Sequence, residues 1–198
     1  MPLEYELTRN LCKNIYEKYP YDGKTQVTIE DGNIKTVVAS FQNSKTQELE
    51  KLVRENITAD EYLINPAGEW MLGGFDADSG LSGRKIVIDN YGPEIGVGGG
   101  SFSGKDYTKV DRSGAYMARR VAVDLLKKEN AEFVRVKLAY AIGKKEPVMA
   151  IAEVDGKETK VSEYDLSPSG IYELLKLKEV KWSKTSQWGH FGRGFTWG

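Results

Sequence analysis

Two Asp-Gly pairs, Asp31-Gly32 and Asp155-Gly156, place the strongest constraint on how this 198-residue chain can fold. Each pair separates two segments rich in residues that favour β-strands, and these four segments are residues 25–30, 33–41, 148–154 and 158–161. An Asp-Gly pair between such segments is a strong signal for a two-residue hairpin. The sequence therefore predicts one antiparallel hairpin in each half of the chain.

Segments with helical periodicity accompany both hairpins. Apolar residues recur at the spacing of one helix face in residues 4–18, 46–56 and 111–129. The inward face of the last and longest of these helices is expected to consist of Ala115, Ala118, Ala122 and Leu125. A shorter helix is predicted over residues 167–176, with Ser167 as its N-cap and Pro168 in its first turn.

The remaining regular segments have the composition of strands, and they are residues 62–65, 84–90 and 133–142. Within the second of them, Ile86-Val87-Ile88 predicts a buried strand. Helices joined to antiparallel hairpins favour an α+β fold, in which two similar units each have an antiparallel or mixed sheet covered by helices. We place these units at residues 1–73 and 74–198. The aromatic, glycine-rich tail from residue 182 onward shows no regular period.

The bulk properties exclude several classes of protein. A net charge of −1 gives no global field toward nucleic acid or membranes, so an anion site has to be local. Cys12 is the only cysteine, which excludes an internal disulfide and a multi-cysteine metal site. The sequence lacks an apolar run of membrane-spanning length and a signal-peptide core, so a cytoplasmic location is expected, with neither nucleic acid nor membrane as a partner.

A glycine-rich block with several cations carries the clearest functional signal. The three glycines at residues 98–100 let the backbone turn where a Cβ would clash, and they expose N–H donors to an anion. Lys105, Lys109 and Arg112 supply positive charge, and Asp111 can hold a metal or cap the helix that follows. A donor loop with three cations and one carboxylate suits a polyphosphate and its counter-ion.

The same block is close to a P-loop without matching it. Residues 99–105 read Gly-x-x-x-x-Gly-Lys, but Asp106 stands where a P-loop requires Ser or Thr for magnesium. A Walker nucleotide site is therefore not expected.

Several further blocks occur in the order shown by one family. The segments in question are DGKTQVT at 22–28, INPAG at 64–68, GRKIVID at 83–89, YAIG at 140–143, EP at 146–147 and GHFGR at 189–193. Together with the glycine–lysine block they resemble the methionine adenosyltransferases (S-adenosylmethionine synthetases). The likeness extends over nearly the whole chain and corresponds to the middle and C-terminal portion of that family.

The resemblance implies that methionine sulfur attacks C5′ of ATP and expels the whole triphosphate, which is then hydrolysed to phosphate and diphosphate. A thioether is already a nucleophile and has no proton to lose, so no Ser-His or Cys-His pair is needed. The demanding task is to stabilise charge on the departing tripolyphosphate with cations and metal ions placed in advance. The family also implies Mg²⁺ and K⁺ as cofactors.

The resemblance further assigns roles to individual residues. The cations that would grip the polyphosphate or the methionine carboxylate are Lys24, Arg84, Lys85, Lys105 and Lys109. Other substrate contacts would come from Asp22, Trp70, Asp78 and Ser101, with Trp70 stacking on adenine and Asp78 contacting both methionine and nucleotide. Asp111 matches a carboxylate associated with magnesium.

The sequence also departs from the family at defined positions. Glu69 stands where the bacterial enzymes carry Arg, Val97 replaces a histidine, and Ser101 replaces an alanine. The amino-terminal His-Pro-Asp-Lys motif, the Gly-Ala-Gly-Asp-Gln-Gly segment and the gating loop between them are not found in these 198 residues. One of the family's three domains is therefore expected to be missing, and a second protein chain with the His-Pro-Asp-Lys half is expected as a partner in a hetero-oligomer.

Each functional interpretation has a structural alternative. Asp111 could be only a helix N-cap, Arg84-Lys85 a solvated pair, and Trp70 a core residue. His190, the only histidine, fits a structural hydrogen-bonding role better than that of a base. The charge-rich residues 176–184 are expected to form a solvated face.

Three functions remain open from the sequence. The leading hypothesis is a subunit of a split methionine adenosyltransferase that supplies the cationic half of the site. The alternative is a non-catalytic subunit that assembles with a complete enzyme and regulates it. A weaker possibility is a stand-alone binder of ATP or tripolyphosphate. The first two predict exposed apolar surface, since a domain that completes the fold is expected to be absent.

Overall fold

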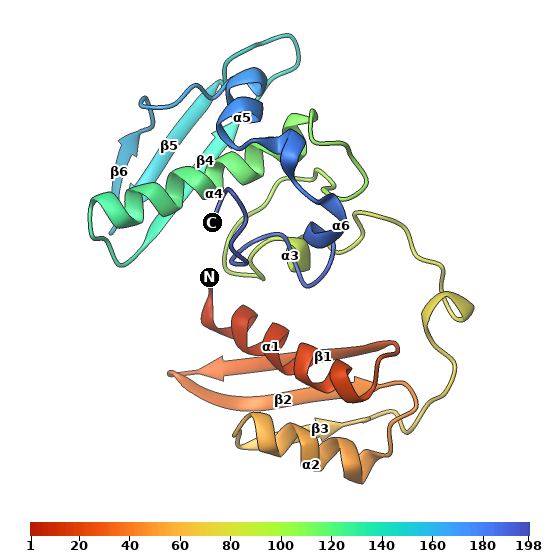
Figure 1. Cartoon of the computed structure of the whole chain (residues 1–198). Coiled ribbons are helices and arrows are strands. Elements are labelled where there is room, and N and C mark those ends of the chain that lie inside the picture. The colour runs from red at the N-terminus through yellow and green to blue at the C-terminus, as the bar shows by residue number, and fades with distance from the viewer. The chain divides into compact units, whose positions relative to one another are not determined.

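The computed structural model describes all residues from Met1 to Gly198. It divides into two compact units: the first comprises Met1–Leu81 with Tyr91–Ile95, and the second comprises Ser82–Asn90 with Gly96–Gly198. Each unit has its own three-stranded sheet and its own helices (Figure 1). The α+β class with two small sheets is thus confirmed, whereas the domain boundary after residue 73 stays a prediction.

The first unit has helices on one face of a mixed sheet. Its strands lie in the order β1-β2-β3, with β1 antiparallel to β2 and β3 parallel to β2. The helices α1 and α2 lie side by side over the sheet (Figure 1). The elements are α1 (Leu3–Lys18), β1 (Gly23–Glu30), β2 (Asn33–Phe41), α2 (Thr46–Asn56), β3 (Glu61–Ile64) and the 3-10 helix η1 (Gly74–Asp76).

The core of the first unit lies between these helices and β2. Burial alternates along β2, because successive side chains of a strand point to opposite faces. Fully buried apolar side chains come from both helices and from β2, and they are Ile15, Val37, Ala39, Phe41, Leu49 and Val53. The opposite face of the sheet carries the exposed polar side chains of β1, Lys24 among them.

The second unit has a helix across an antiparallel sheet. The strands lie in the order β4-β5-β6, and α4 packs mainly on β4 while α5 packs on α4 (Figure 1). The elements are α3 (Ile86–Asp89), α4 (Val110–Lys128), β4 (Val134–Ala139), β5 (Met149–Val154), β6 (Lys157–Lys160), α5 (Pro168–Leu174), the 3-10 helix η2 (Leu177–Glu179) and α6 (Trp182–Thr185).

Both predicted hairpins are confirmed. Asp31 and Gly32 have φ of 50° and 75°, and Asp155 and Gly156 have φ of 46° and 81°. Positive φ at both central positions is the geometry of the type I′ turn, whose twist matches that of the flanking strands. The cap of α5 is confirmed as well, since Ser167 Oγ accepts a hydrogen bond of 3.2 Å from the backbone N–H of Gly170.

The buried strand predicted at residues 86–88 is wrong. These residues belong to α3, and Val87 and Ile88 are exposed. A helical turn forms because the N–H of Asp89 donates to the carbonyl of Lys85, and the side-chain amide of Asn90 donates to the carbonyl of Ile86 at 2.8 Å. The short apolar run is therefore closed by local hydrogen bonds and has no sheet partner.

The buried face predicted for α4 is also wrong. The alanines at 115, 118 and 122 are only half-buried, whereas Tyr116, Met117 and Val121 are inaccessible to solvent. The helix is turned so that its larger apolar side chains lie inward, because they bury more apolar surface than alanine does.

The C-terminal tail packs against α4 with its aromatic side chains. The rings of Tyr116 and Trp197 are stacked, with centroids 4.0 Å apart and an interplanar angle of 8°. Leu177 is fully buried, so the solvated face predicted for residues 176–184 is wrong at that position, although the lysines around it are exposed. From residue 182 onward, the tail contributes Phe191 and Trp197 to the second unit's core.

Large apolar side chains are exposed along one segment of the first unit. Each of them is more than two thirds exposed, and they are Met71, Leu72, Phe75 and Leu81. No helix of the structure combines the length and the apolar character needed to cross a membrane.

Candidate functional site

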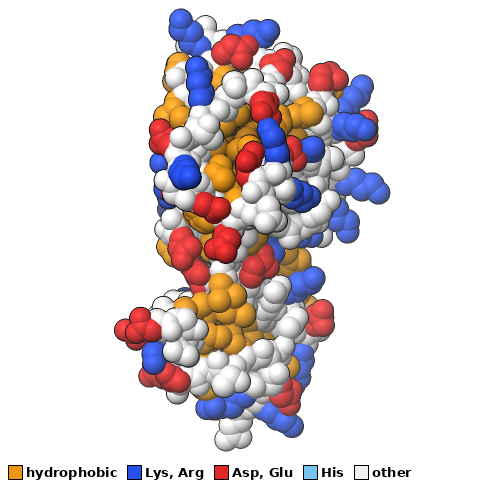
Figure 2. Space-filling model, turned by 90° about the vertical axis from the view of Figure 1, so that its left-hand side faces the viewer, with side chains coloured by type: hydrophobic (Ala, Val, Ile, Leu, Met, Phe, Trp, Pro, Cys, Tyr) orange, Lys and Arg blue, Asp and Glu red, His pale blue; other side chains and the backbone are white.

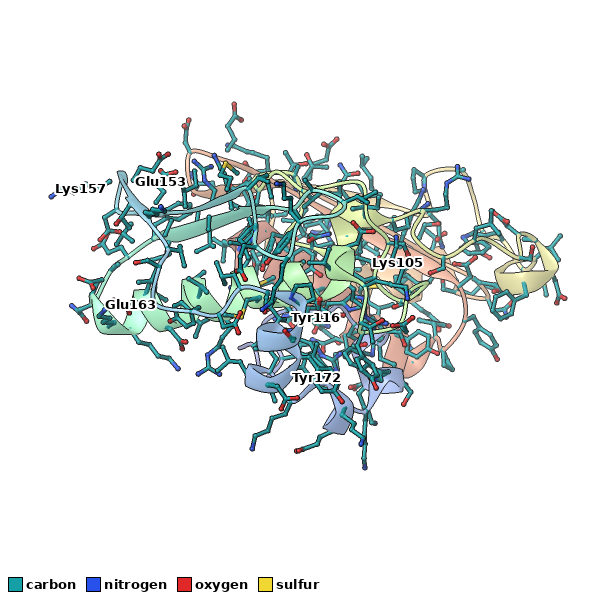
Figure 3. The ribbon with its side chains drawn as sticks, turned by 90° about the horizontal axis from the view of Figure 1, so that it is seen from above. Lys105, Tyr116, Glu153, Lys157, Glu163 and Tyr172 are labelled. Atoms are coloured by element: carbon teal, nitrogen blue, oxygen red, sulfur yellow. The ribbon has the colours of Figure 1, made fainter.

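A cleft of about 490 Å³ lies at the N-terminal end of α4, within the second unit. Its walls come from the second half of the glycine–lysine block, from the first turn of α4 and from the start of α5, and the lining residues are Gly104, Lys105, Asp106, Thr108, Lys109, Val110, Asp111 and Pro168. Lys105 lies beside the start of α4, and Lys157 lies at the opposite end of the same unit (Figure 3). Three of the predicted site residues therefore line one cleft.

The two lysines of the cleft are paired with nearby carboxylates. Lys105 Nζ lies 3.3 Å from Asp111 Oδ2, and Lys109 Nζ lies 3.2 Å from Asp106 Oδ2. Exposed ion pairs of this kind contribute only about 0–1 kcal/mol. A polyphosphate can replace these contacts at little energetic cost, so both ammonium groups are available to an incoming anion.

Asp106 shapes the turn that carries Lys109. Its Oδ1 accepts hydrogen bonds from the backbone N–H of Thr108, at 2.8 Å, and from the hydroxyl of Thr108. Together with the ion pair to Lys109, these bonds lower the pKa of Asp106 to about 2. Asp106 therefore remains ionised at neutral pH and serves the turn, in a position where a P-loop has a hydroxyl.

The N-terminus of α4 adds a favourable field at the cleft. The helix has 19 residues, its N-cap residue is Lys109, and no side chain caps this end. The aligned peptide dipoles give a helix N-terminus a partial positive charge that favours anions. Asp111 lies in the first turn, so the alternative in which Asp111 is the N-cap is wrong.

Arg112 differs from the prediction that it adds positive charge to the loop. Its side chain points into the core of the second unit and is only 4% exposed. The guanidinium donates to the carbonyl of Lys105 and to the hydroxyls of Tyr116 and Thr185. It is turned away from the cleft, since three of its N–H donors are bound inside the unit and its side chain is buried.

The structure brings the Arg84-Lys85 block against the glycine loop. Gly83 has a φ of 78°, and a Cβ on it would lie 2.6 Å from Cβ of Ser101. Only glycine allows this approach, which places the exposed Arg84 and Lys85 next to the loop that leads to Lys105. Ser101 accepts a hydrogen bond of 3.3 Å from the N–H of Gly104, so its hydroxyl has a role within the loop.

The three successive glycines are not equivalent. Gly98 and Gly99 have open space where a Cβ would stand, which contradicts the predicted clash at those positions. At Gly100 a Cβ would lie 2.6 Å from Cβ and 2.9 Å from Cγ of Asp111. Asp111 therefore lies directly against the glycine backbone.

The Walker interpretation is excluded further, because the element before the loop is α3, whereas a P-loop follows a strand.

Gly100→Ala is expected to lower the free energy of unfolding by about 1–3 kcal/mol, the usual cost of overpacking. The new methyl group would collide with the base of the Asp111 side chain, which cannot rotate away. Gly99→Ala is the matched control and should stay within about 0.5 kcal/mol of the parent chain. Chemical denaturation of the two variants checks this, and equal destabilisation would contradict the close approach at Gly100.

The remaining predicted residues lie in the first unit, and two of them meet there. A Cβ on Gly73 would lie 2.6 Å from the ring of Trp70 and 3.0 Å from Cβ of Asp22. Asp22 Oδ2 accepts a hydrogen bond of 3.0 Å from the N–H of Gly74, and Trp70 Nε1 donates to Ser40 Oγ at 2.9 Å. Trp70 is half-buried, with its indole N–H bound to the sheet, so part of its ring remains accessible.

The other two predicted residues of the first unit, Lys24 and Asp78, have different surroundings. Lys24 pairs with Ser40 in the β1–β2 register and is exposed, so it shares a sheet face with the residue that holds Trp70. Asp78 is exposed and accepts a hydrogen bond of 2.8 Å from the N–H of Gly80, which forms a local turn.

Glu69, one of the departures from the family, has a structural role. Its carboxylate pairs with Lys45 at 2.8 Å and accepts a hydrogen bond of 2.9 Å from the N–H of Thr46, the first residue of α2. These contacts lower the pKa of Glu69, the hydrogen bond from Lys45 foremost. A carboxylate at this position therefore stabilises the start of α2. The identity of residue 69 alone does not reveal this role.

Asp111 is a carboxylate of the kind that would hold a magnesium ion bound mainly by substrate. No group of three or more acidic, histidine or cysteine side chains forms a metal cage. Mg²⁺ needs no such cage, since it is usually held by one or two carboxylates together with phosphate oxygens and water. Asp111 is half-exposed at the rim beside Lys105 and meets that requirement. No residue of the structure points to K⁺, which stays a prediction.

Comparisons with known proteins agree with the resemblance. The sequence model of the S-adenosylmethionine synthetase C-terminal domain matches residues 72–198. The S-adenosylmethionine synthase of Thermus thermophilus is 42% identical over 235 residues, which cover 100% of this chain and 60% of that protein. The corresponding protein of Kosmotoga olearia is 38% identical over 229 residues, covering 98% of this chain and 58% of that protein.

A solved structure shows the same similarity. An unusual S-adenosylmethionine synthetase from Campylobacter jejuni superposes with a TM-score of 0.85 at 30% identity, over 100% of this chain and 64% of that one. The present chain spans about 60% of the length of the curated relatives it matches. On the extent of the domain match and the identity to these relatives, the chain belongs to the S-adenosylmethionine synthetase family.

Proposed function

We propose that this chain is the polyphosphate-binding part of a split methionine adenosyltransferase, which makes S-adenosylmethionine from ATP and methionine together with a second polypeptide. The observation that carries the proposal is the cleft at α4, where Lys105 and Lys109 each pair with an exposed carboxylate. Membership of the family supports the reaction class. A chain that uses ATP in this way is expected in the cytoplasm.

The proposed chemistry matches the side chains present. A methionine sulfur needs no base, so the cleft can work without a nucleophile or a general base of its own. What the reaction requires is positive charge arranged before the triphosphate departs. Lys105, Lys109 and the N-terminus of α4 would supply that charge from one side. The exposed Arg84 and Lys85 would extend it along the chain of phosphates.

Asp111 is the residue proposed to associate with Mg²⁺. When bound, the ion would neutralise phosphate charge and orient the triphosphate. Asp111 itself would turn from the Lys105 ammonium toward the ion, leaving that ammonium free for a phosphate oxygen. The carboxylate would thus have two partners in turn, Lys105 without substrate and the metal ion with it.

The first unit is proposed to supply the contacts to methionine and adenine. Trp70 presents a half-buried indole suited to stacking on a base, and Asp22 lies beside it. Lys24 and Asp78 are exposed and can contact the carboxylate and the amino group of methionine. These assignments follow the family positions.

The second polypeptide is proposed because these 198 residues offer no counterpart to the histidine of the family's His-Pro-Asp-Lys motif. The only histidine, His190, is buried in the second unit with a pKa lowered to about 4. It cannot take the place of the histidine in the family's His-Pro-Asp-Lys motif. A partner chain with that motif would bring it, together with further magnesium and potassium ligands.

Reconstitution tests the proposal. The chain is purified alone and together with a candidate protein that carries His-Pro-Asp-Lys, and S-adenosylmethionine formation from ATP and methionine is assayed in each sample. We expect turnover only in the mixture, and co-migration of the two chains in size-exclusion chromatography. Substantial turnover by this chain alone would refute the need for a partner, and absence of turnover in every mixture would refute the catalytic role.

A further inference from the structure

The side chain of Arg112 ties three segments of the second unit together. Nη1 donates to the carbonyl of Lys105 at 2.6 Å, Nε to the hydroxyl of Tyr116 at 2.9 Å, and Nη2 to Oγ1 of Thr185 at 3.0 Å. The guanidinium also lies over the ring of Trp182, 4.3 Å from its centroid. The cleft loop, α4 and the C-terminal tail therefore meet at one buried cation.

We infer that Arg112 is a positioning residue for the anion cleft, which sets the place of Lys105 by holding its backbone carbonyl from inside the unit. The inference rests on the proposed role of Lys105 in binding polyphosphate. Arg112 itself is 4% exposed, and its three hydrogen bonds are directed into the unit, away from a ligand in the cleft. Its neighbour Asp111, by contrast, lies at the cleft rim, so two successive residues of α4 serve opposite sides of the loop.

A second set of contacts holds the loop next to Lys105. The Tyr116 hydroxyl that accepts from Arg112 lies 2.9 Å from Nδ1 of His190, whose Nε2 lies 3.4 Å from Oγ of Ser103. The ring of Phe102, 4% exposed, packs edge-on against His190 with centroids 5.1 Å apart. In Figure 3, Tyr116 lies in the half of α4 that is nearer to Lys105. Buried side chains of the second unit thus hold the loop at residues 102, 103 and 105.

The geometry requires arginine at this position. Its planar fork presents donors in fixed directions, so it can satisfy a carbonyl, a phenol and a threonine hydroxyl at once. A lysine would retain the charge but could not make the three contacts with the same directions. The consequence for Lys105 is positional: if the carbonyl moves, the ammonium leaves its place beside Asp111 and the N-terminus of α4.

The test compares variants that keep charge with variants that keep geometry. Arg112→Lys retains the charge and loses the fork, Thr185→Val removes one acceptor, and Thr185→Ser keeps it. Arg120→Lys is the matched control on the same helix, because Arg120 pairs with Asp124 and binds Thr196 without touching the loop. Binding of inorganic tripolyphosphate with Mg²⁺ to the full chain is measured by calorimetry, together with amide hydrogen exchange of residues 101–109.

We expect Arg112→Lys and Thr185→Val to bind tripolyphosphate roughly tenfold more weakly, the usual scale for losing one hydrogen bond to a charged group. Exchange at residues 101–109 should accelerate in both. Thr185→Ser and Arg120→Lys should match the parent chain in both measurements, even if Arg120→Lys lowers the melting temperature. Unchanged affinity and exchange in Arg112→Lys and Thr185→Val would overturn the inference.

Lys105→Ala separates this inference from the proposed function. If Lys105→Ala weakens tripolyphosphate binding while Arg112→Lys does not, the proposed role of Lys105 in binding polyphosphate stands and the positioning role of Arg112 fails. If the parent chain and Lys105→Ala bind tripolyphosphate equally, or if neither binds it, the proposed role of Lys105 fails and the positioning role of Arg112 fails with it.

Discussion

Lys105→Ala is expected to lower the rate of S-adenosylmethionine formation in the reconstituted enzyme by about 10²- to 10³-fold, the usual loss when one preorganised donor to a developing charge is removed. The ammonium lies in the cleft, 3.3 Å from Asp111, where negative charge would accumulate as the triphosphate departs. The loss should appear in kcat, with a smaller change in KM for methionine, because the interaction strengthens as the bond to C5′ breaks. Steady-state kinetics of the mixed chains measures it.

Lys157→Ala is the control for this experiment. Lys157 is an exposed lysine of the same unit at the end opposite Lys105 (Figure 3), and its loss removes the same charge and should leave the rate unchanged. Acidic and basic side chains are interspersed over the face of the unit shown in Figure 2, so a single distant lysine carries no long-range effect. An equal rate for Lys105→Ala and the parent would favour the alternative, a regulatory subunit that only assembles with an active enzyme.

The second large effect is expected from pH. Burial lowers the pKa of His190 from 6.5 to about 4, with added repulsion from Arg112 and Arg193. Between these two values the unfolded chain binds a proton that the folded chain does not, so stability should fall as pH drops from 6.5 to 4. A difference of this size corresponds to about 3 kcal/mol lost across that window, a substantial part of an ordinary domain's stability.

The contribution of His190 is isolated with His190→Gln. Other groups titrate in the same range, and the pKa of the neighbouring Asp89 is raised by burial, which acts in the opposite sense. Urea unfolding of both chains from pH 7 to pH 4 therefore yields the slope of stability against pH for each. We expect the slope of the parent to exceed that of the variant, by at most about 1.4 kcal/mol per pH unit. Parallel slopes would show that His190 takes no part.

Local signals in the sequence predicted the regular elements well. The Asp31-Gly32 and Asp155-Gly156 turns and the Ser167 cap each depend on two or three adjacent residues, so the chemistry that forms them is present in the sequence. The prediction of a strand at residues 86–88 was wrong, because the local signal there was too short. An apolar run of three residues does not distinguish a strand from a helical turn, and the decisive group was the side chain of Asn90.

The candidate site was predicted in its residue types but not in its arrangement. Lys105, Lys109 and Asp111 meet in one cleft because they are close in sequence and α4 begins between them. Arg112 was grouped with the cations of the loop, and only the fold shows that it points inward. Its partner Thr185 lies 73 residues farther along the chain. Contacts at such separations leave no periodic trace in a single sequence, and neither does the approach of Gly100 to Asp111.

The path of the chain between the two units has a practical consequence. Residues 82–90 belong to the second unit, yet Tyr91–Ile95 returns to the first before the chain crosses again. A protease that cuts after Asn90 would therefore produce two fragments, each with a segment packed in the other's unit. Cleavage there need not release either piece, and neither unit can be isolated intact by shortening the chain from one end. Because the chain passes from one unit to the other more than once, it has to be cut at more than one of these crossings to separate the units.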